Sequence, residues 1–262
     1  GGFRSQLRTP ARARLGPRLR ARVRGRDRGR HPAGSENLPH PGTDPATRVR
    51  SGAPRLRRDG EQIRDLALAA SDLLVEKVGG PPVKPYQPEG IWAAVAMPQS
   101  NTKNYQRDTG DKLYRRSLYT FWKRTAPHPA MEIFNAPTRE VTCVARERTN
   151  TPLQAFVTLN DPQFVEASRR LAEHAMAGEG FDARLDFITT RLISRRLVSE
   201  EREHVRRTFE AAMEKFGADP ESAKQFISEG ETEPDPQLAA PEVAAWTLVS
   251  SQILNLDETL NR

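Results

Sequence analysis

Cysteine is nearly absent from this 262-residue chain, which contains only Cys143. A single cysteine excludes an internal disulfide framework, but it does not fix the compartment, because a large helical domain can be secreted without disulfides. No apolar run reaches the roughly 18 residues that a transmembrane helix needs, so the sequence predicts no membrane span. The chain does not begin with methionine and is expected to be a fragment. The lack of a signal peptide is therefore not evidence for the cytoplasm.

The sequence also lacks the motifs of the common enzyme classes. It has no glycine-rich phosphate loop, no CxxC or CxxCH pair, no HExxH metal motif and no GxSxG nucleophile motif. These absences exclude the commonest nucleotide-binding, haem-binding and hydrolase assignments. We therefore expect no metal site and no cofactor in this chain itself.

Residues 1–60 contain no lysine and no isoleucine, and their charge differs from that of the rest of the chain. Sixteen arginines stand against four acidic residues there, a formal charge of +12, whereas the other 202 residues carry 25 basic and 30 acidic side chains, or −5. Like charges at this density repel, and no apolar face is available for burial. The sequence therefore predicts that residues 1–56 form a disordered, Arg-rich N-terminal arm.

Three interpretations of this arm remain open. The arm could bind nucleic acid by neutralising phosphates, although Phe3 is the only aromatic residue in it that could stack on bases. It could be a solvated linker. It could also come from a GC-rich gene translated out of frame, which the abrupt change to ordinary sequence near Arg57 favours.

From Gly60 onward the apolar residues recur with helical spacing. No alternating strand pattern is convincing, and Glu140–Ala145 is the best short candidate. Residues 81–110 are rich in proline, glycine, asparagine and glutamine and are expected to be a long ordered loop. The sequence therefore predicts an all-α, irregular multi-helix domain over residues 57–262 with long ordered loops. The expected helices are 61–78, 111–123, one starting at Pro152, 162–177, 183–197, 200–216, 220–228 and 241–256, and the loop is expected to be held by Tyr86, Ile91, Trp92, Val95 and Met97.

Three of these helix starts carry the same local signal. A capping residue is followed by proline at Thr151-Pro152, Asp161-Pro162 and Asp219-Pro220. Threonine and aspartate accept hydrogen bonds from free backbone N–H groups, and proline fits the first helical position. These dipeptides should therefore fix where the three helices begin.

The segment 117–161 concentrates the residue types that carry chemistry. His128 stands between two prolines, and near Glu132, Asn135 and Cys143 it could transfer protons or bind a metal. Alternatively, His128 only hydrogen-bonds a loop to the body of the domain. Cys143 could pair with His128 as a thiolate and imidazole, or it could be a small buried apolar residue.

The same segment carries groups suited to anions. Arginines such as Arg139 can clamp a carboxylate, sulfate or phosphate if they are partly buried, whereas exposed ones would form a solvated charged surface. A helix start also binds anions through its free N–H groups, although capping alone explains the residues found there. The candidate catalytic residues are His128, Glu132, Arg139, Glu140 and Cys143, and the candidate ligand-binding residues are Arg148, Thr149, Asn150, Thr151 and Gln154.

Four stretches resemble one known family. They are RRDGEQIRDLALAASDLL at 57–74, VKPYQPEGIW at 83–92, RTNTPLQAFVTLNDPQFVEA at 148–167 and AAWTLVSSQILNLDETL at 244–260. The stretch at 148–167 is highly specific. Together they resemble the planctomycetal surface domain family, known as domain of unknown function 1553, over about residues 57–262. The family has ordinary folded sequence in place of residues 1–56, where this chain departs from it.

The resemblance implies the C-terminal part of a longer exported planctomycete protein. Such proteins often carry an N-terminal cytochrome-c-like domain, so haem c would belong to a missing upstream domain. The resemblance further implies an extracytoplasmic location, in the periplasm or at the cell surface. The family pattern has Asp at the position of Asn135 and Cys at the position before Cys143, and these departures argue against a metal or thiol role here.

Three functional hypotheses follow. The first is a non-catalytic, extracytoplasmic helical module of a cytochrome-linked surface protein, accessory to redox chemistry or to handling extracellular polymers. Its expected partners are the upstream domains of the same protein and extracellular polysaccharide. The second is an enzyme of unrecognised type with a site around residues 128–154. The third is nucleic-acid binding through the Arg-rich arm, and nucleic acid is the least expected partner.

Overall fold

The computed structural model describes residues 56–261, and within this range the fold is all-α, as the sequence predicts. The predicted disordered arm falls, apart from Leu56, outside the described residues, and so does the nucleic-acid hypothesis that depends on it. No helix in the described range is long and apolar enough to cross a bilayer. The α-helices are α2 Gly60–Ala70, α3 Ile91–Val95, α4 Pro129–Ile133, α5 Pro152–Asn160, α6 Pro162–Ala175, α7 Gly180–Ile193, α8 Ser199–Ala218, α9 Pro220–Ile227, α10 Ala240–Leu254 and α11 Asp257–Leu260, and the 3-10 turns are η1 Gly110–Lys112 and η2 Ser117–Tyr119.

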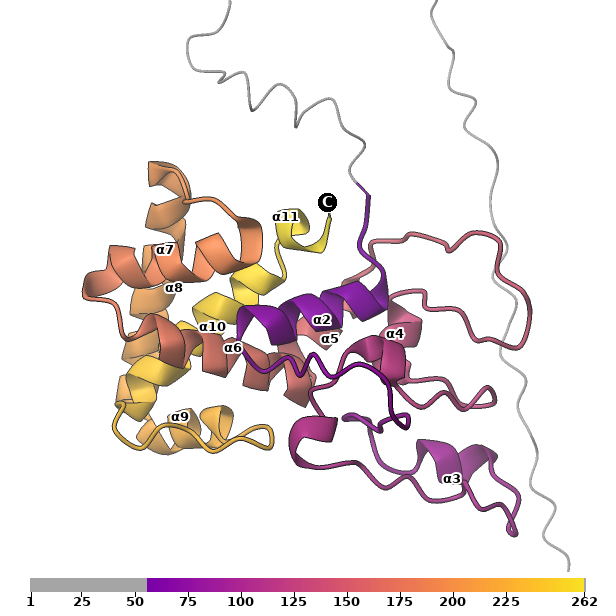
Figure 1. Cartoon of the computed structure of the whole chain (residues 1–262). Coiled ribbons are helices and arrows are strands. Elements are labelled where there is room, and N and C mark those ends of the chain that lie inside the picture. The colour runs from indigo at the N-terminus through magenta and orange to yellow at the C-terminus, as the bar shows by residue number, and fades with distance from the viewer. Residues whose placement is uncertain (1–55, 262) are drawn as a thin grey trace, which may run out of the picture. The chain divides into compact units, whose positions relative to one another are not determined.

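Helices α6 and α10 form the centre of the domain, and α2, α5, α7, α8 and α9 pack around them (Figure 1). Helix α10 is apolar on nearly all sides, which is typical of a helix that is buried all round. Its Trp246 is 1% exposed and packs against the rings of Phe181 and Phe209, with centroids 5.3 and 4.6 Å away. These rings join α7 and α8 to the central pair.

The three cap-proline dipeptides begin helices where the sequence predicts. Thr151 is the N-cap of α5, and proline follows it as the first helical residue. The side chain of Asp161 accepts a hydrogen bond from the backbone N–H of Gln163, and Asp219 does the same for Ser222. The side chain of Thr151 makes no capping hydrogen bond, so the expected side-chain cap forms only at Asp161 and Asp219, each within three residues of the donor that it satisfies.

The predicted helix over residues 111–123 is wrong: this stretch contains only the two turns η1 and η2. The cause is the buried guanidinium of Arg64 on α2. It donates to the carbonyl oxygens of Leu113 and Arg115 at 2.6 and 2.8 Å, and to the hydroxyl of Ser117 at 3.0 Å. An α-helix would use those carbonyls for its own N–H groups. The N–H of Ser117 donates instead to the carboxylate of Asp65.

Helix α2 is shorter than predicted, ending at Ala70 instead of Val78. The hydroxyl of Ser71 bonds to the carbonyl of Ala67, and Asp72 takes a positive φ of 57°. The left-handed residue reverses the chain direction, and the N–H groups of Leu73 and Leu74 then donate to the carbonyl of Leu68, which closes the end of the helix. The weak strand candidate, Glu140–Ala145, is an exposed loop.

The loop 81–110 is only partly held as predicted. Tyr86 and Trp92 are buried, and Trp92 packs edge-on against Tyr105 with ring centroids 4.8 Å apart. Val95 and Met97 are 51% and 77% exposed, so these two side chains do not attach the loop to the core. The aromatic side chains therefore hold the loop, because each buries far more surface than a single aliphatic side chain.

A buried polar stripe on α6 fixes the irregular segments around it; it consists of Gln163, Glu166, Arg169 and Glu173. Glu166 is fully buried, and its carboxylate accepts hydrogen bonds from Tyr86 Oη at 3.0 Å and Tyr114 Oη at 2.7 Å. It also accepts hydrogen bonds from the backbone N–H groups of Glu231 and Thr232, at 3.0 and 2.7 Å, and from the hydroxyl of Thr232. One carboxylate thus joins the 81–119 region to the α9–α10 connection.

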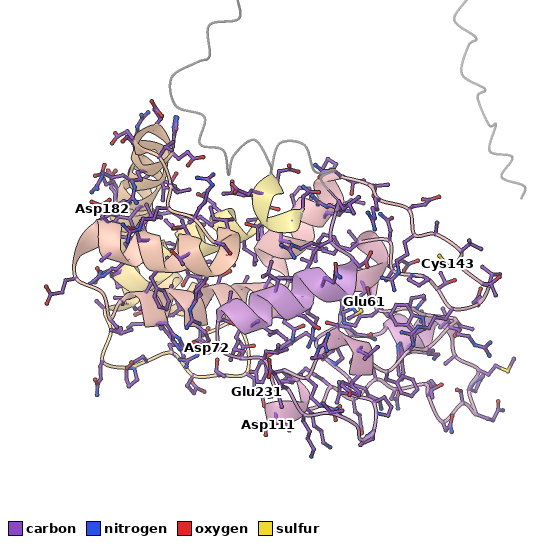
Figure 2. The ribbon with its side chains drawn as sticks, turned by 45° about the horizontal axis from the view of Figure 1, so that its top comes forward. Glu61, Asp72, Asp111, Cys143, Asp182 and Glu231 are labelled. Atoms are coloured by element: carbon purple, nitrogen blue, oxygen red, sulfur yellow. The ribbon has the colours of Figure 1, made fainter. Side chains whose placement is uncertain are left out.

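Two further contacts complete this junction. Gly230 takes a φ of 109°, and a Cβ atom there would lie 2.5 Å from the Glu166 carboxyl carbon, so only glycine lets the backbone approach this closely. Arg169, also fully buried, donates to Glu173 at 2.7 Å and to the hydroxyl of Thr232 at 2.7 Å. Figure 2 shows Glu231 close to the turn that carries Asp111. The carboxylate of Glu231 accepts a hydrogen bond from the backbone N–H of Gly110 in this turn, at 3.2 Å.

Replacing Glu166 by Gln should destabilise the domain by about 3 kcal/mol, because an amide group would face several buried donors with one oxygen instead of a carboxylate. Urea unfolding measures the free-energy difference. Glu203→Gln is the matched control, since Glu203 is 56% exposed and pairs with Arg207 on its own helix; we expect a change below about 0.5 kcal/mol there. Equal effects of the two substitutions would contradict the role of Glu166.

Candidate functional site

His128 lies at the N-cap of the short helix α4, and proline follows it at the first helical position. Its side chain is 6% exposed, and its Nε2 lies 2.7 Å from the backbone carbonyl oxygen of Tyr86. A carbonyl oxygen can only accept, so Nε2 carries the proton and donates. The ring thereby attaches α4 to the loop 81–110. This contact agrees with the alternative that His128 hydrogen-bonds a loop to the body of the domain.

His128 also lines a small, partly open cavity, together with Arg64 of α2, Asp161 and Gln163 at the start of α6, and apolar side chains. The cavity volume is about 10 Å³, which is room for about one water molecule. Burial shifts the titration of each ionisable group on its wall. It lowers the pKa of His128 to about 4 and of Arg64 to about 10, and it raises the pKa of Asp161 to about 6.

Gln154 is the second candidate that the structure buries; it is 1% exposed. Its amide nitrogen donates to the carbonyl of Ile133 at 3.0 Å, and its oxygen accepts from Arg57 at 2.7 Å. The hydroxyl of Thr149 accepts from the amide of Asn135 at 2.7 Å, and the Gln154 amide lies 3.3 Å away. This network closes the base of the 135–151 loop and joins α4 to α5.

The other candidates lie at the surface. Arg139 takes a positive φ of 63°, and its guanidinium lies over the ring of Trp122, 4.7 Å from the centroid. Cys143 is exposed on the 135–151 loop (Figure 2). Thr151 is half-buried and serves as the N-cap of α5 through its backbone. The remaining exposed candidates are Glu132, Glu140, Arg148 and Asn150.

The ten candidates therefore divide between two environments. His128, Gln154 and Thr149 are held by hydrogen bonds inside the domain, whereas most of the others face solvent on the 135–151 loop. The loop itself is fastened near its middle by Arg146, which donates to the carboxylate of Glu61 at 2.6 and 3.1 Å. His128 does not share the cavity with Glu132, Asn135 or Cys143, its expected neighbours; Asp161, Arg64 and Gln163 line it instead.

Sequence reasoning treated Asp161 as a helix cap only and missed Arg64 and Gln163. One signal in the sequence could have found them. Arg64 and Gln163 are polar residues on the otherwise apolar faces that α2 and α6 bury. Such residues need partners from elsewhere in the chain, and the sequence does not show which partners they find.

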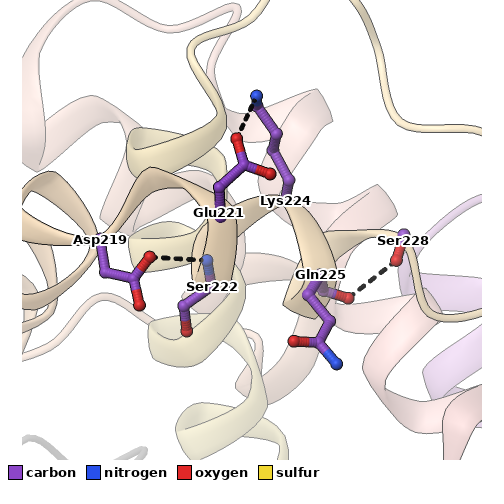
Figure 3. A pocket seen from close by; sticks show the side chains of 6 residues that line it. All are labelled: Asp219, Glu221, Ser222, Lys224, Gln225 and Ser228. Carbon is purple, nitrogen blue, oxygen red and sulfur yellow. Dashed lines mark hydrogen bonds and ion pairs between the residues drawn. The ribbon is translucent and has the colours of Figure 1, made fainter.

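A second hollow lies on the surface of α9 (Figure 3). It is shallow and open to solvent, and every interaction drawn there joins residues of α9 to its own cap or next turn, such as Lys224 with Glu221 at 2.7 Å. One helix cannot enclose a ligand, so this hollow is a feature of the helix surface. Its lining residues are Asp219, Glu221, Ser222, Lys224, Gln225 and Ser228.

A family model, described as PSD1, protein of unknown function (DUF1553), matches residues 34–209. This chain belongs to the DUF1553 family. The match confirms the resemblance and includes 148–167, its most specific stretch. It also includes residues 34–56, which the sequence assigned to the arm, and it ends within α8, before the stretch at 244–260. No curated protein and no solved structure matches the chain significantly.

In this DUF1553 protein, replacing His128 by Gln should flatten the loss of stability in acid. Because the folded-state pKa lies below the ordinary value, the neutral ring stabilises the fold fully above pH 6.5, and this contribution is lost as the pH falls toward 4. Between pH 7 and 4.5, the native protein should lose about 2 kcal/mol more than the variant in urea unfolding. Gln retains a donor for the Tyr86 carbonyl.

The control for this comparison is His204→Gln, because His204 is exposed on α8. It should lose the same stability in acid as the native protein. Asp161, whose raised pKa acts in the opposite direction, is present in all three proteins. Parallel pH profiles for the native protein and His128→Gln would contradict the burial of a neutral ring.

Proposed function

We propose that this DUF1553 chain is a non-catalytic, extracytoplasmic helical module of a cytochrome-linked planctomycete surface protein, accessory to redox chemistry or to handling extracellular polymers. The family resemblance supports the setting. The division of the candidate residues between buried structural contacts and an exposed loop supports the accessory role. Haem c would belong to an upstream domain, and upstream domains would be the first partners of this module.

The observation that carries the accessory role is the placement of His128. A general base must reach the substrate proton directly or through one water. His128 is 6% exposed, its Nε2 is engaged by the Tyr86 carbonyl, and the cavity beside it has room for about one water molecule. A sugar residue or another substrate of similar size does not fit there. The imidazole therefore serves the fold in this arrangement.

The exposed loop 135–151 supports contact with an extracellular polymer. Arg139 is presented on the face of Trp122, and Arg148 lies at the other end of the loop, close to the start of α5. Guanidinium groups form strong paired hydrogen bonds with sulfate and carboxylate, and an aromatic ring beside them favours the apolar face of a sugar. A sulfated or uronic-acid polysaccharide has the chemistry that this surface would recognise.

The direct test is to assay the purified chain on sulfated and unsulfated polysaccharides for reducing ends and released sulfate, and to measure binding by gel retardation. We expect no release above that of heat-denatured chain, and retardation by at least one anionic polysaccharide that weakens with salt. The double variant Arg139→Gln/Arg148→Gln should reduce retardation, whereas Arg206→Gln/Arg207→Gln on α8 should not. Release that disappears in His128→Gln but persists in His204→Gln would identify an enzyme and overturn the accessory role.

A further inference from the structure

His128 has a hydrogen-bonding atom that the domain itself does not satisfy. Because Nε2 donates to the Tyr86 carbonyl and burial excludes a second proton, Nδ1 is a bare acceptor. Among the described residues, no group donates to it. A buried acceptor without a donor costs about 1–3 kcal/mol, so such atoms normally bond to protein or to an ordered water.

The donors on the cavity wall are already engaged. Arg64 Nε donates to Gln163 Oε1, and its Nη atoms donate to the carbonyls of the 113–117 region. The amide of Gln163 is directed to the same region, 3.4 Å from the carbonyl of Leu113. Neither side chain therefore supplies a proton to His128.

Asp161 contributes a second acceptor to the cavity. One of its oxygens, Oδ1, accepts the backbone N–H of Gln163 at 3.0 Å, which leaves further lone pairs on the carboxylate. Burial raises its pKa to about 6, against the opposing effects of the Gln163 N–H and of Arg64. The cavity of about 10 Å³ is thus lined by two residues that carry acceptors, His128 with its unpartnered Nδ1 and Asp161 with its carboxylate.

We propose that this cavity is a binding site for a single water molecule, which donates one hydrogen to His128 Nδ1 and the other to the carboxylate of Asp161. Water is the neutral double donor of the right size, and the guanidinium of Arg64 on the same wall disfavours a cation. The bridge joins the N-terminus of α4 to that of α6. It also links an imidazole and a carboxyl group through one exchangeable molecule.

This site is independent of the accessory role, because it concerns the interior of the domain and not its partner surface. A crystal structure of the full chain that resolves ordered waters tests it first. We expect one water within about 2.7–3.1 Å of both His128 Nδ1 and an Asp161 oxygen. A cavity without density, a water bonded to only one of the two groups, or a protein donor on Nδ1 would each overturn the proposal.

Solution NMR of chain labelled with ¹⁵N-histidine gives a second test. The His128 signals, assigned by their loss in His128→Gln, should show a proton on Nε2 and a hydrogen-bonded acceptor at Nδ1. Asp161→Asn should shift the Nδ1 signal. Asp219→Asn, the same change at the matching N-cap of α9, should leave it unchanged. A folded Asp161→Asn protein with an unmoved His128 signal would exclude the shared water.

Discussion

The structure depends on one constraint: burying a charged side chain is costly unless its hydrogen-bonding groups find partners. Arg64 on α2 and Glu166 and Arg169 on α6 are all at most 4% exposed. Each finds partners in irregular backbone, in the 113–117 region or in the α9–α10 connection, and only Nε of Arg169 has none among the described residues. The helices therefore supply charges and the loops supply backbone groups, and each orders the other. This explains how a domain with so much irregular chain keeps one conformation.

The same constraint determines what the 117–161 segment does. Its start is held by Arg64, His128 is fastened to the Tyr86 carbonyl, and Gln154 closes the base of the following loop. What remains free is the loop surface, with Arg139 on Trp122. The density of polar residue types that makes this segment conspicuous is thus largely a requirement of the fold, with a small cavity beside His128 and an open loop surface beyond it.

Local chemistry could be predicted from the sequence, and long-range chemistry could not. The cap-proline dipeptides at Thr151, Asp161 and Asp219 begin helices as predicted, because each cap acts within its own turn. The apolar spacing of 111–123 also fitted a helix, but the deciding donor, Arg64, comes from 49–53 residues earlier in the chain. Likewise the neighbours of His128 in the cavity come from α2 and α6, whereas the sequence suggested residues close to it. Family membership could also be identified from the sequence, because short local stretches such as 148–167 are sufficient for it.

The measurement that tests this dependence most directly is hydrogen exchange on the native chain and on Arg64→Gln. If buried charge orders the irregular segments, amides of residues 110–120 should exchange faster in the variant by a factor of at least about 10, the effect of losing roughly 1.4 kcal/mol of local stability. Amides of α7 and α8, which Arg64 does not contact, should change far less. Uniform acceleration across all helices, or unchanged exchange at 110–120, would contradict the claim that this side chain holds that segment.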